Sequence, residues 1–440
     1  ALKQYETLGE EVGAALDTAE AIFAPKDQTL DDDDGKGFTE VIKSAPVSKI
    51  VSVILRHAIE GRASDIHIEP VGNQSKIRYR IDGVLHTTIV LPIYVHSALI
   101  SRIKVMSNLK IDETRIPQDG RIRIKIHGKD VDFRISTIPL MGHEKVVMRI
   151  LETPDKAPTF EELGFMGNHA KRVAASIKKP NGLFLVTGPT GSGKSTTLFA
   201  GLSVLNREDV NIATLEDPVE YYVPGVNQSQ VRPEVGFTFA TGLRALLRQD
   251  PDIIMVGEIR DNETAELSIH AGLTGHFVLS TLHTNDALGA IPRMFDMHIE
   301  PFLLASTLNV VIAQRLVRKI CTKCKEEITL PDNILEIVKK KLVGIPDDAF
   351  YGGASKDKLV FYKGKGCAQC GDTGYKGRVA IVETIDINKK MKDIVAKGFD
   401  RTAVDEELAK QAFITMDLDG LIKSLLGLTT VEEILRVSAM

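Results

Sequence analysis

The sequence is poor in aromatic residues and has no long apolar run. Aromatic side chains make up 5% of its 440 residues, tryptophan is absent and the formal net charge is -4. Nucleic-acid binding uses basic surfaces with aromatic side chains for stacking, so this composition disfavours a nucleic-acid partner. No apolar stretch approaches the roughly 20 residues of a membrane-spanning helix, and no signal peptide opens the chain. We therefore expect a cytoplasmic protein, with a truncated or processed start because residue 1 is Ala1 rather than Met.

Cysteine is also scarce. The four cysteines, Cys321, Cys324, Cys367 and Cys370, form two CxxC pairs separated by 42 residues. This arrangement favours a metal over disulfides. Each pair can hold one edge of a tetrahedral ion, and four thiolates without a water position make a closed structural zinc site. Free thiols and an iron–sulfur cluster are the alternatives.

The first part of the chain divides into a linker and a small domain, since 440 residues exceed what a single core usually holds. Residues 1–45 are polar and include four consecutive aspartates, as in a flexible linker. From 46 to 152, a helical apolar pattern is followed by alternating strands with one polar face. These residues predict an N-terminal α+β domain.

The rest of the chain predicts an α/β domain followed by two smaller regions. A breaker-rich segment predicts an interdomain hinge over residues 153–165. In residues 166–314, short apolar strands alternate with longer helical stretches, which is typical of a parallel, doubly wound sheet. A tetracysteine zinc module follows at 315–385, and residues 386–440 read as a C-terminal helical region.

A phosphate-binding loop is the strongest motif. It follows an apolar strand and leads into a helix, as the P-loop pattern requires. Its backbone N–H groups and helix N-terminus favour phosphate, Lys194 is expected to reach the β- and γ-phosphates, and Ser195 to hold Mg²⁺. A ligand-free glycine turn is the alternative. The predicted ATP-binding residues of the loop are Gly188, Pro189, Thr190, Gly191, Ser192, Gly193, Lys194, Ser195 and Thr196.

Acidic residues follow two of the predicted strands. Glu258 ends the strand that begins near Asp252, where it is placed to act as general base for an attacking water. Gly257 stands where a Walker B strand usually has an aspartate, so Ser195 with waters would hold the metal. Glu216 ends another strand and is expected to orient water or magnesium. The alternative for Glu258 is a solvated strand-end carboxylate, and for Glu216 it is a solvated acidic turn.

Together these motifs resemble the type II/type IV secretion ATPase family. The resemblance extends from residue 46 to about residue 385. The four cysteines favour its pilus-extension and secretion branches over the retraction branch, which lacks the metal module. The resembling segments are the P-loop, the acidic box 214–220, Gly257-Glu258, the histidine box 276–283, and segments 64–70, 117–121, 246–252 and 366–378.

The resemblance implies a RecA-like P-loop ATPase core behind a PAS-like N-terminal domain, assembled as a homohexamer. ATP would bind between these two domains, and hydrolysis with Mg²⁺ would open and close them to drive pilin polymerisation through an inner-membrane platform protein. The chain would work at the inner face of the cytoplasmic membrane, peripheral to it and without nucleic acid. The resemblance also implies an N-terminal docking domain that this sequence does not include.

Several residue roles are carried over from the family. Glu258 corresponds to the catalytic glutamate, Glu216 to the acidic-box glutamate and His283 to the histidine-box residue; a histidine that only caps or packs is the alternative for the last. Arg134 and Arg149 match first-domain arginines placed over the phosphates, where guanidinium groups bind oxygen pairs. The RecA-like side adds three candidates, Arg260 as catalytic and Arg244 and Arg248 as nucleotide-binding residues.

Other functions remain open at this point. A type II secretion ATPase is the nearest alternative to pilus assembly. A nucleic-acid translocase on the same core is less favoured, because a P-loop fold does not fix the substrate but the composition argues against nucleic acid. A zinc-bearing adaptor without catalysis would leave Lys194, Ser195 and Glu258 unexplained.

Overall fold

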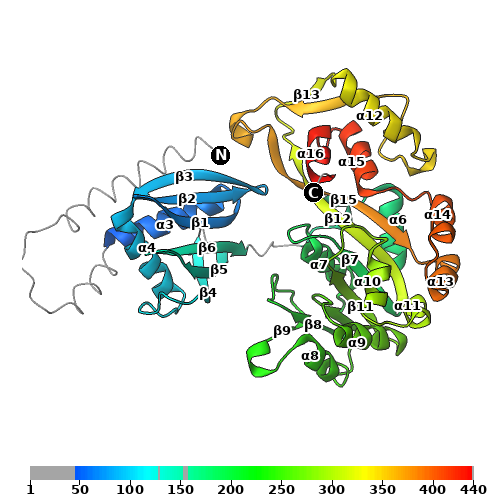
Figure 1. Ribbon diagram of the computed structural model, residues 1–440, viewed down its shortest axis with the longest axis horizontal. Helices are drawn as coiled ribbons and strands as arrows, with labels where there is room; N and C mark the ends of the chain where they lie inside the picture. The colour runs from blue at the N-terminus through cyan, green and yellow to red at the C-terminus, as the bar shows by residue number, and fades with distance from the viewer. Residues whose placement is uncertain (1–44, 127–128, 152–156, 439–440) are drawn as a thin grey trace, which may run out of the picture. The chain divides into compact units, whose positions relative to one another are not determined.

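The computed structural model describes residues 45–126, 129–151 and 157–438 (Figure 1). Nearly all of the predicted linker 1–45 and the start of the predicted hinge 153–165 lie outside these residues. The chain divides into two compact units on either side of the boundary between Thr153 and Pro154; the loop 366–373 is described below with the cysteines that it carries.

The described residues of the first unit form a six-stranded antiparallel sheet with two helices. Its strand order is β3-β2-β1-β6-β5-β4. The elements are α3 (Ala45–Glu60), β1 (Ala63–Val71), β2 (Gln74–Ile81), β3 (Val84–Pro92), α4 (Ile93–Met106), β4 (Gln118–Ile126), β5 (Lys129–Pro139) and β6 (Glu144–Leu151).

The two faces of this sheet differ in polarity. On one face, buried residues such as Ile66, Tyr79 and Phe133 join a core with α3 and α4. Because successive strand residues point to opposite faces, the residues between them form the other face. That face carries ion pairs, including Arg78 with Glu69 at 2.7 Å. The predicted strands with one polar face are therefore present.

The second unit is built around a seven-stranded sheet. Its order is β15-β12-β7-β11-β10-β8-β9. The sheet strands are β7 (Gly182–Thr187), β8 (Ile212–Glu216), β9 (Asn227–Gln230), β10 (Ile253–Val256), β11 (Phe277–Leu282), β12 (Leu308–Ile320) and β15 (Tyr375–Asp386). The helices up to β12 are α5 (Phe160–Leu163), α6 (Gly167–Ser176), α7 (Lys194–Leu205), α8 (Phe239–Leu246), α9 (Asn262–Leu273), α10 (Ala290–Asp296) and α11 (Pro301–Thr307).

The parallel core predicted for residues 166–314 is present, and the sheet extends beyond it by one antiparallel strand. Every neighbouring pair from β12 to β9 is parallel, but β15 pairs antiparallel with β12. Both strands reach into the segment predicted as the zinc module, and residues 321–374 between them form an excursion from the main sheet. The sequence pattern hides this because long-range pairing leaves no local signal.

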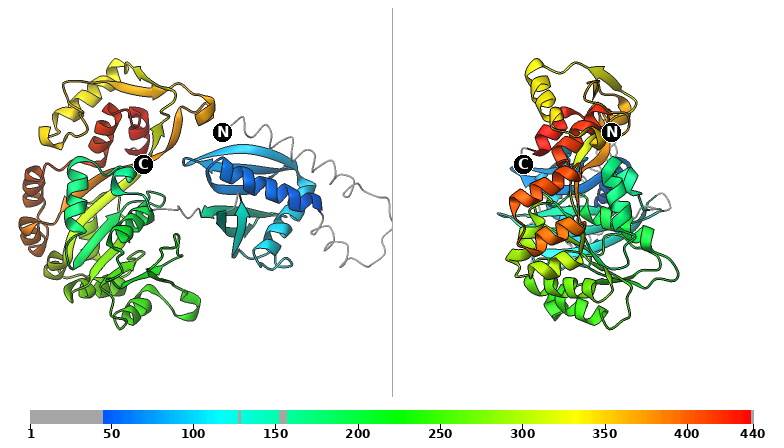
Figure 2. Two further views of the ribbon diagram at one scale, coloured as in Figure 1. Left: turned by 180° about the vertical axis from the view of Figure 1, so that it is seen from behind. Right: turned by 90° about the vertical axis from the view of Figure 1, so that its right-hand side faces the viewer.

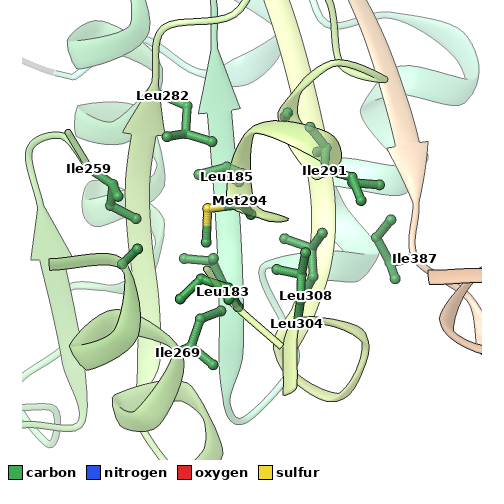
Figure 3. Packing of buried hydrophobic residues seen from close by; sticks show 14 of the residues in the cluster. Leu183, Leu185, Ile259, Ile269, Leu282, Ile291, Met294, Leu304, Leu308 and Ile387 are labelled. Atoms are coloured by element: carbon green, nitrogen blue, oxygen red, sulfur yellow. The ribbon is translucent and has the colours of Figure 1, made fainter. Parts of the chain in front are cut away.

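Both faces of the seven-stranded sheet are buried, which explains its continuous apolar strands. In β7, Leu183 and Leu185 contribute to the core shared with α9, α10 and α11 (Figure 3). Phe184 and Val186 contribute to the opposite core, shared with α5, α6 and α7. The backbone of these elements can be followed in the further views of Figure 2. The strand is thus fixed by packing on each side.

The excursion, apart from its loop 366–373, and the C-terminal helices form the remainder of the second unit. The excursion contains the hairpin-like pair β13 (Lys325–Ile328) and β14 (Phe361–Gly364) and the helix α12 (Asp332–Val343). The C-terminal helices are α13 (Lys389–Ala396), α14 (Arg401–Lys410), α15 (Met416–Leu425) and α16 (Val431–Ser438). Apolar residues of α12, such as Leu342, share a core with Leu421 and Ile434 of these helices. Among the described residues, no helix is both long and apolar enough to cross a membrane.

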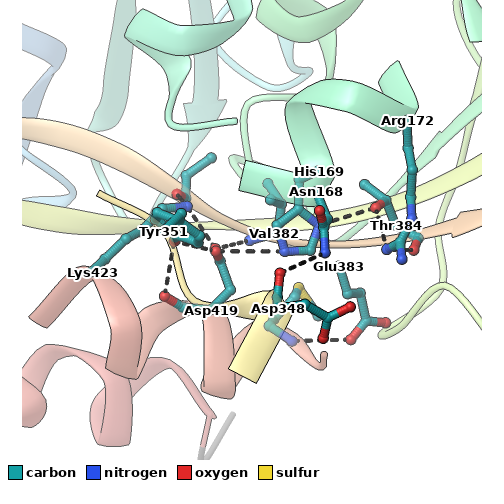
Figure 4. A network of polar contacts seen from close by, with 12 residues as sticks. Asn168, His169, Arg172, Asp348, Tyr351, Val382, Glu383, Thr384, Asp419 and Lys423 are labelled. Atoms are coloured by element: carbon teal, nitrogen blue, oxygen red, sulfur yellow. Dashed lines mark hydrogen bonds and ion pairs between the residues drawn. The ribbon is translucent and has the colours of Figure 1, made fainter. Parts of the chain in front are cut away.

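A network of buried ionisable side chains joins α6, β15 and α15 (Figure 4). Asp419 pairs with Lys423 at 2.6 Å, and both side chains are fully buried. Asp419 also accepts hydrogen bonds from the Tyr351 hydroxyl and the Val382 backbone N–H. Burial lowers the pKa of nearby His169 to about 4, so this imidazole is neutral at pH 7.

Candidate nucleotide site and cysteine cluster

The predicted P-loop connects a buried strand to a helix. β7 ends at Thr187 and α7 begins at Lys194. Between them Gly188, Gly191 and Gly193 have φ values of 147°, 80° and 91°, which side chains with a Cβ rarely adopt. This geometry brings the loop's backbone to the N-terminus of α7, where N–H groups and partial positive charge favour a phosphate.

The lysine of this loop folds back over it. Lys194 Nζ donates hydrogen bonds to the carbonyl oxygens of Gly188 at 2.8 Å and Pro189 at 3.1 Å. Burial lowers the pKa of Lys194, whereas the negative charges of Glu258 and Glu220 raise it. Ser195 is exposed in the first turn of α7. The loop thus offers a cation and a hydroxyl next to each other, as binding of a metal-bound polyphosphate requires.

Glu258 lies just beyond β10 and is held by two partners. Its carboxylate oxygens contact Arg260 Nη2 at 2.7 Å and His283 Nε2 at 3.0 Å, and its side chain is only 13% exposed. The hydrogen bond with Glu258 raises the pKa of Arg260. Three residues that the sequence assigned separately to catalysis therefore form one cluster at the carboxyl ends of β10 and β11.

Gly257 is built into the turn that carries Glu258. Its N–H donates to Leu215 O at 2.8 Å, and its carbonyl accepts from Thr281 Oγ1 at 2.7 Å. A Cβ at this position would lie 3.2 Å from Leu215 O, closer than most such contacts. Close packing against β8 thus explains a glycine here.

The two histidines of the histidine box lie at opposite ends of β11. His283 follows the strand and contacts Glu258, as described above. His276 precedes the strand, and its Nδ1 hydrogen-bonds with Ala271 O at 2.9 Å, at the end of α9. Only His283 is therefore on the edge that carries Glu258.

Glu216 ends β8, beside β10 in the sheet. Its Oε1 accepts hydrogen bonds from Thr214 Oγ1 at 2.6 Å and Gln228 Nε2 at 2.9 Å. Burial raises the pKa of Glu216, although these two hydrogen bonds lower it. Sequence reasoning missed Gln228, because a polar side chain on an edge strand resembles an ordinary exposed one.

Arg134 and Arg149 lie on the polar face of the first unit. They stand directly opposite each other in the β5–β6 ladder, and both are exposed. Arg149 Nε contacts Asp65 Oδ1 at 3.1 Å. The predicted alternation is therefore correct, and the first unit presents two guanidinium groups side by side.

Arg244 and Arg248 make contacts away from the P-loop. Arg244 pairs with Glu263 on α9, and Arg248 Nη1 donates to Arg244 O at 2.7 Å. Arg244 lies in α8, which packs on β8, β10 and α9, and Arg248 follows the end of this helix. None of these contacts involves a P-loop residue, so a role of these arginines in nucleotide binding stays a prediction.

The four cysteines lie together. Their sulfur atoms are all within 4.8 Å of one another, and those of Cys367 and Cys370 are 3.7 Å apart. Thiolates around zinc at about 2.3 Å would be about 3.8 Å apart, so this set fits a tetrahedral ion. The Cys367 N–H also donates to the Cys370 sulfur at 3.2 Å, which favours the thiolate.

Two strand ladders bring the cysteine pairs together. Cys321 follows β12 directly, and the β12–β15 ladder reaches Ile320 opposite Tyr375, shortly after Cys370. On the other side, Lys325 is opposite Gly364 in the β13–β14 ladder. One ladder therefore pairs the backbone just outside the four cysteines, and the other pairs it just inside them. Together they bring the two CxxC pairs close in space although 42 residues separate them in sequence.

Comparison with known proteins agrees with this geometry. The family described as "Type II/IV secretion system protein" matches residues 40–436. The chain belongs to this family. A relative named "Type IV pilus assembly ATPase PilB", from Myxococcus xanthus, is 43% identical over 95% of this chain and 72% of its own length. A relative named "Type II secretion system protein E", from Xanthomonas campestris pv. campestris, is 44% identical over 92% of this chain and 70% of its own.

Solved structures of the family share this fold. A structure titled "Crystal Structure of the Pilus Retraction Motor PilT and Bound ADP" has a TM-score of 0.61 and 27% identity, covering 89% of this chain and 97% of that one. The Legionella pneumophila ATPase DotB, at 22% identity and a TM-score of 0.63 over 88% of this chain and 95% of its own, agrees in fold. The predicted family, fold class and ATPase activity are confirmed.

Proposed function

We propose that this chain is a hexameric motor that hydrolyses ATP and uses closure of its two units to drive pilin polymerisation. The observation that carries the proposal is the cluster of Glu258, Arg260 and His283 at the strand ends of a P-loop domain. In this proposal Lys194 binds the β- and γ-phosphates, Ser195 holds Mg²⁺ and Glu258 accepts a proton from the attacking water. Glu216, in its buried setting, orients the water or the metal.

The motor is proposed to act on an inner-membrane platform protein from the cytoplasmic face. The two exposed arginines of the first unit, Arg134 and Arg149, would close over the phosphates of the bound nucleotide. The cysteine cluster would hold one structural zinc. The proposed domains are an N-terminal α+β domain at 46–152 and a RecA-like ATPase domain that begins at residue 166. The tetracysteine zinc module is the excursion between β12 and β15, and a C-terminal helical region follows β15. The nearest alternative is type II secretion, because the relatives named for the two systems are 43% and 44% identical to this chain.

The first experiment measures ATP binding and hydrolysis separately. Glu258→Gln keeps the shape of the side chain but removes the base, so ATP should bind with near wild-type affinity while turnover falls by about 10²–10⁴-fold. Lys194→Ala should lose binding as well. Near wild-type hydrolysis by the Gln variant would remove Glu258 from the mechanism.

A second experiment tests closure. Arg134→Ala and Arg149→Ala should each lower turnover while retaining part of the ATP affinity, which the P-loop supplies. Arg78→Ala is the matched control, because Arg78 lies on the same polar face and pairs with Glu69 as Arg149 pairs with Asp65; it should be near wild type. If turnover is unchanged in both variants, Arg134 and Arg149 are surface residues without a role in hydrolysis. Complementation of a strain lacking the pilus-extension ATPase, against one lacking the secretion ATPase, then separates the two systems.

A further inference from the structure

Gln314 lies beside the P-loop although it is 120 residues further along the chain than Lys194. It belongs to β12, which pairs in parallel with the P-loop strand β7. Ala313 is opposite Thr187, the last residue of β7, so Gln314 is level with the first residue of the loop. Its side chain is 1% exposed.

Both polar atoms of the Gln314 amide form hydrogen bonds with the P-loop and its helix. Nε2 donates to the backbone carbonyl of Ser192 at 2.8 Å, and Oε1 accepts from the Thr197 hydroxyl at 2.8 Å. Thr197 is itself buried in α7. Among side chains of this length, only glutamine carries an uncharged donor and an uncharged acceptor on the same carbon at neutral pH.

The loop also packs closely around this residue. A Cβ at Gly188 would lie 2.5 Å from the backbone oxygen of Gln314, and one at Gly193 would lie 3.1 Å from its Nε2. Two glycines of the loop are therefore required partly by the approach of Gln314. Gly188 is the first residue of the loop and Gly193 the last before α7, so Gln314 packs against both ends of the loop.

The hydrogen bond to Ser192 has a direct consequence for phosphate binding. In a trans peptide, the carbonyl of one residue and the N–H of the next point in opposite directions. With the Ser192 carbonyl held by Gln314, the Gly193 N–H must point away from Gln314. That N–H precedes α7, among the donors that a P-loop offers to phosphate.

We propose that Gln314 is a positioning residue for nucleotide binding, which fixes the Ser192–Gly193 peptide and thereby aims the Gly193 N–H at a bound phosphate. The inference rests on the proposed ATP hydrolysis and adds to it a residue outside the nucleotide motifs. The Gly193 N–H contacts the phosphate both in bound ATP and in the transition state of hydrolysis. Losing Gln314 should therefore weaken both states equally, which raises KM and leaves kcat nearly unchanged.

The test compares Gln314→Met with a matched variant. Methionine keeps length and volume but removes both hydrogen bonds, leaving the Ser192 carbonyl without this donor. The dissociation constant for MgATP should rise by about tenfold to a hundredfold, with kcat at saturating ATP within about threefold of wild type. The control is Gln411→Met, since Gln411 also donates to and accepts from backbone, at Asp386, away from the P-loop. Its MgATP affinity should be that of the wild type.

A second pair of variants keeps the test decisive if Gln314→Met does not fold. Thr197→Val removes the hydroxyl that donates to Gln314 and should weaken MgATP binding by about fivefold. Thr197→Ser keeps this hydroxyl and should bind MgATP with wild-type affinity. Wild-type affinity in Gln314→Met or in Thr197→Val would overturn the inference. If the wild type binds MgATP and Lys194→Ala does not, that result leaves the proposed function standing. A wild type that binds no MgATP would remove both.

Discussion

Two clusters of ionisable side chains in the second unit contain similar residue types but differ in burial. The strand-end cluster consists of Glu258, Arg260 and His283, and the last two side chains are 66% and 44% exposed. The buried cluster contains the fully buried pair Asp419 and Lys423, with Tyr351 and His169 around them (Figure 4).

The difference shows which polar groups are available for chemistry. In the strand-end cluster only Arg260 and His283 are open to solvent, and Glu258 is mostly buried. An ion pair that is open to solvent contributes about 0–1 kcal/mol, so these two side chains can exchange their contact for a phosphate or a water at small cost. Breaking a buried pair by removing one partner costs about 3–5 kcal/mol, because a charge is left without compensation in a low-dielectric interior. Burial raises the pKa of Tyr351 well above its usual value, which keeps this hydroxyl a hydrogen-bond donor to Asp419. This difference supports the proposed catalytic role of the first cluster and a role in stability for the second.

The largest expected effect on stability comes from the cysteine cluster, which is a third group of ionisable side chains to compare with the other two. If Cys321, Cys324, Cys367 and Cys370 hold one zinc, the site contributes on the order of 10 kcal/mol to local folding, as in small zinc domains. Cys321→Ser should then lose the zinc and unfold the excursion 321–374, while the strand-end residues stay intact. Metal analysis and limited proteolysis measure these results. Protein without zinc, or with iron and visible absorbance, would contradict the assignment.

Asp419 should show the next largest effect. Asp419→Ala leaves Lys423 buried without its carboxylate and should lower the free energy of unfolding by about 3–5 kcal/mol. The double variant Asp419→Leu with Lys423→Met should recover part of this loss. Urea unfolding followed by circular dichroism is suitable, because the chain contains no tryptophan.

The control for Asp419 is an exposed pair of the same chemistry and spacing. Arg401 and Asp405 are also four residues apart on a helix, and their side chains are 69% and 55% exposed. Asp405→Ala should cost less than about 0.5 kcal/mol. Equal losses for Asp405→Ala and Asp419→Ala would break the comparison, because burial would then not distinguish the clusters.

Glu383 should give a somewhat smaller, pH-dependent effect. Its two carboxylate oxygens accept from the Ala287 N–H at 2.6 Å and the Met416 N–H at 3.1 Å, so it connects the segment after His283 to α15. Burial raises the pKa of Glu383 to about 7 from its ordinary 4.5. The folded protein thus binds this proton more tightly than the unfolded chain, and stability should fall as the pH rises from about 4.5 to about 7.

The expected loss from Glu383 over that range is about 3 kcal/mol. Glu383→Gln cannot ionise and should flatten this part of the stability profile. Urea unfolding of both proteins at pH 5, 6, 7 and 8 gives the measurement. Parallel profiles for wild type and Gln variant would show that the carboxyl group does not ionise in this range.

Local sequence patterns were sufficient to predict the structure where the functional residues are consecutive in the chain. The strand, glycine loop and helix around Lys194 were predicted correctly, as were the polar and apolar faces of β5 that expose Arg134. The antiparallel edge strand β15 was not predicted, because its neighbour β12 lies more than fifty residues earlier. Gln314 was missed for the same reason, since the loop that it contacts lies more than a hundred residues earlier. Gln228 was missed because a polar residue on an edge strand resembles an ordinary exposed one.

The sequence by itself determined the P-loop, the apolar strands that lead to Glu216 and Glu258, and the pairing of cysteines within each CxxC. These features depend on periodicity and on the conformational freedom of glycine, which act over a few residues. Only the tertiary structure decided that Glu258 contacts Arg260 and His283, that β12 and β15 bring the two cysteine pairs together, and that Gln314 holds the P-loop. Such contacts depend on strand order and burial, because these set which distant residues share a sheet edge and which charges lose water.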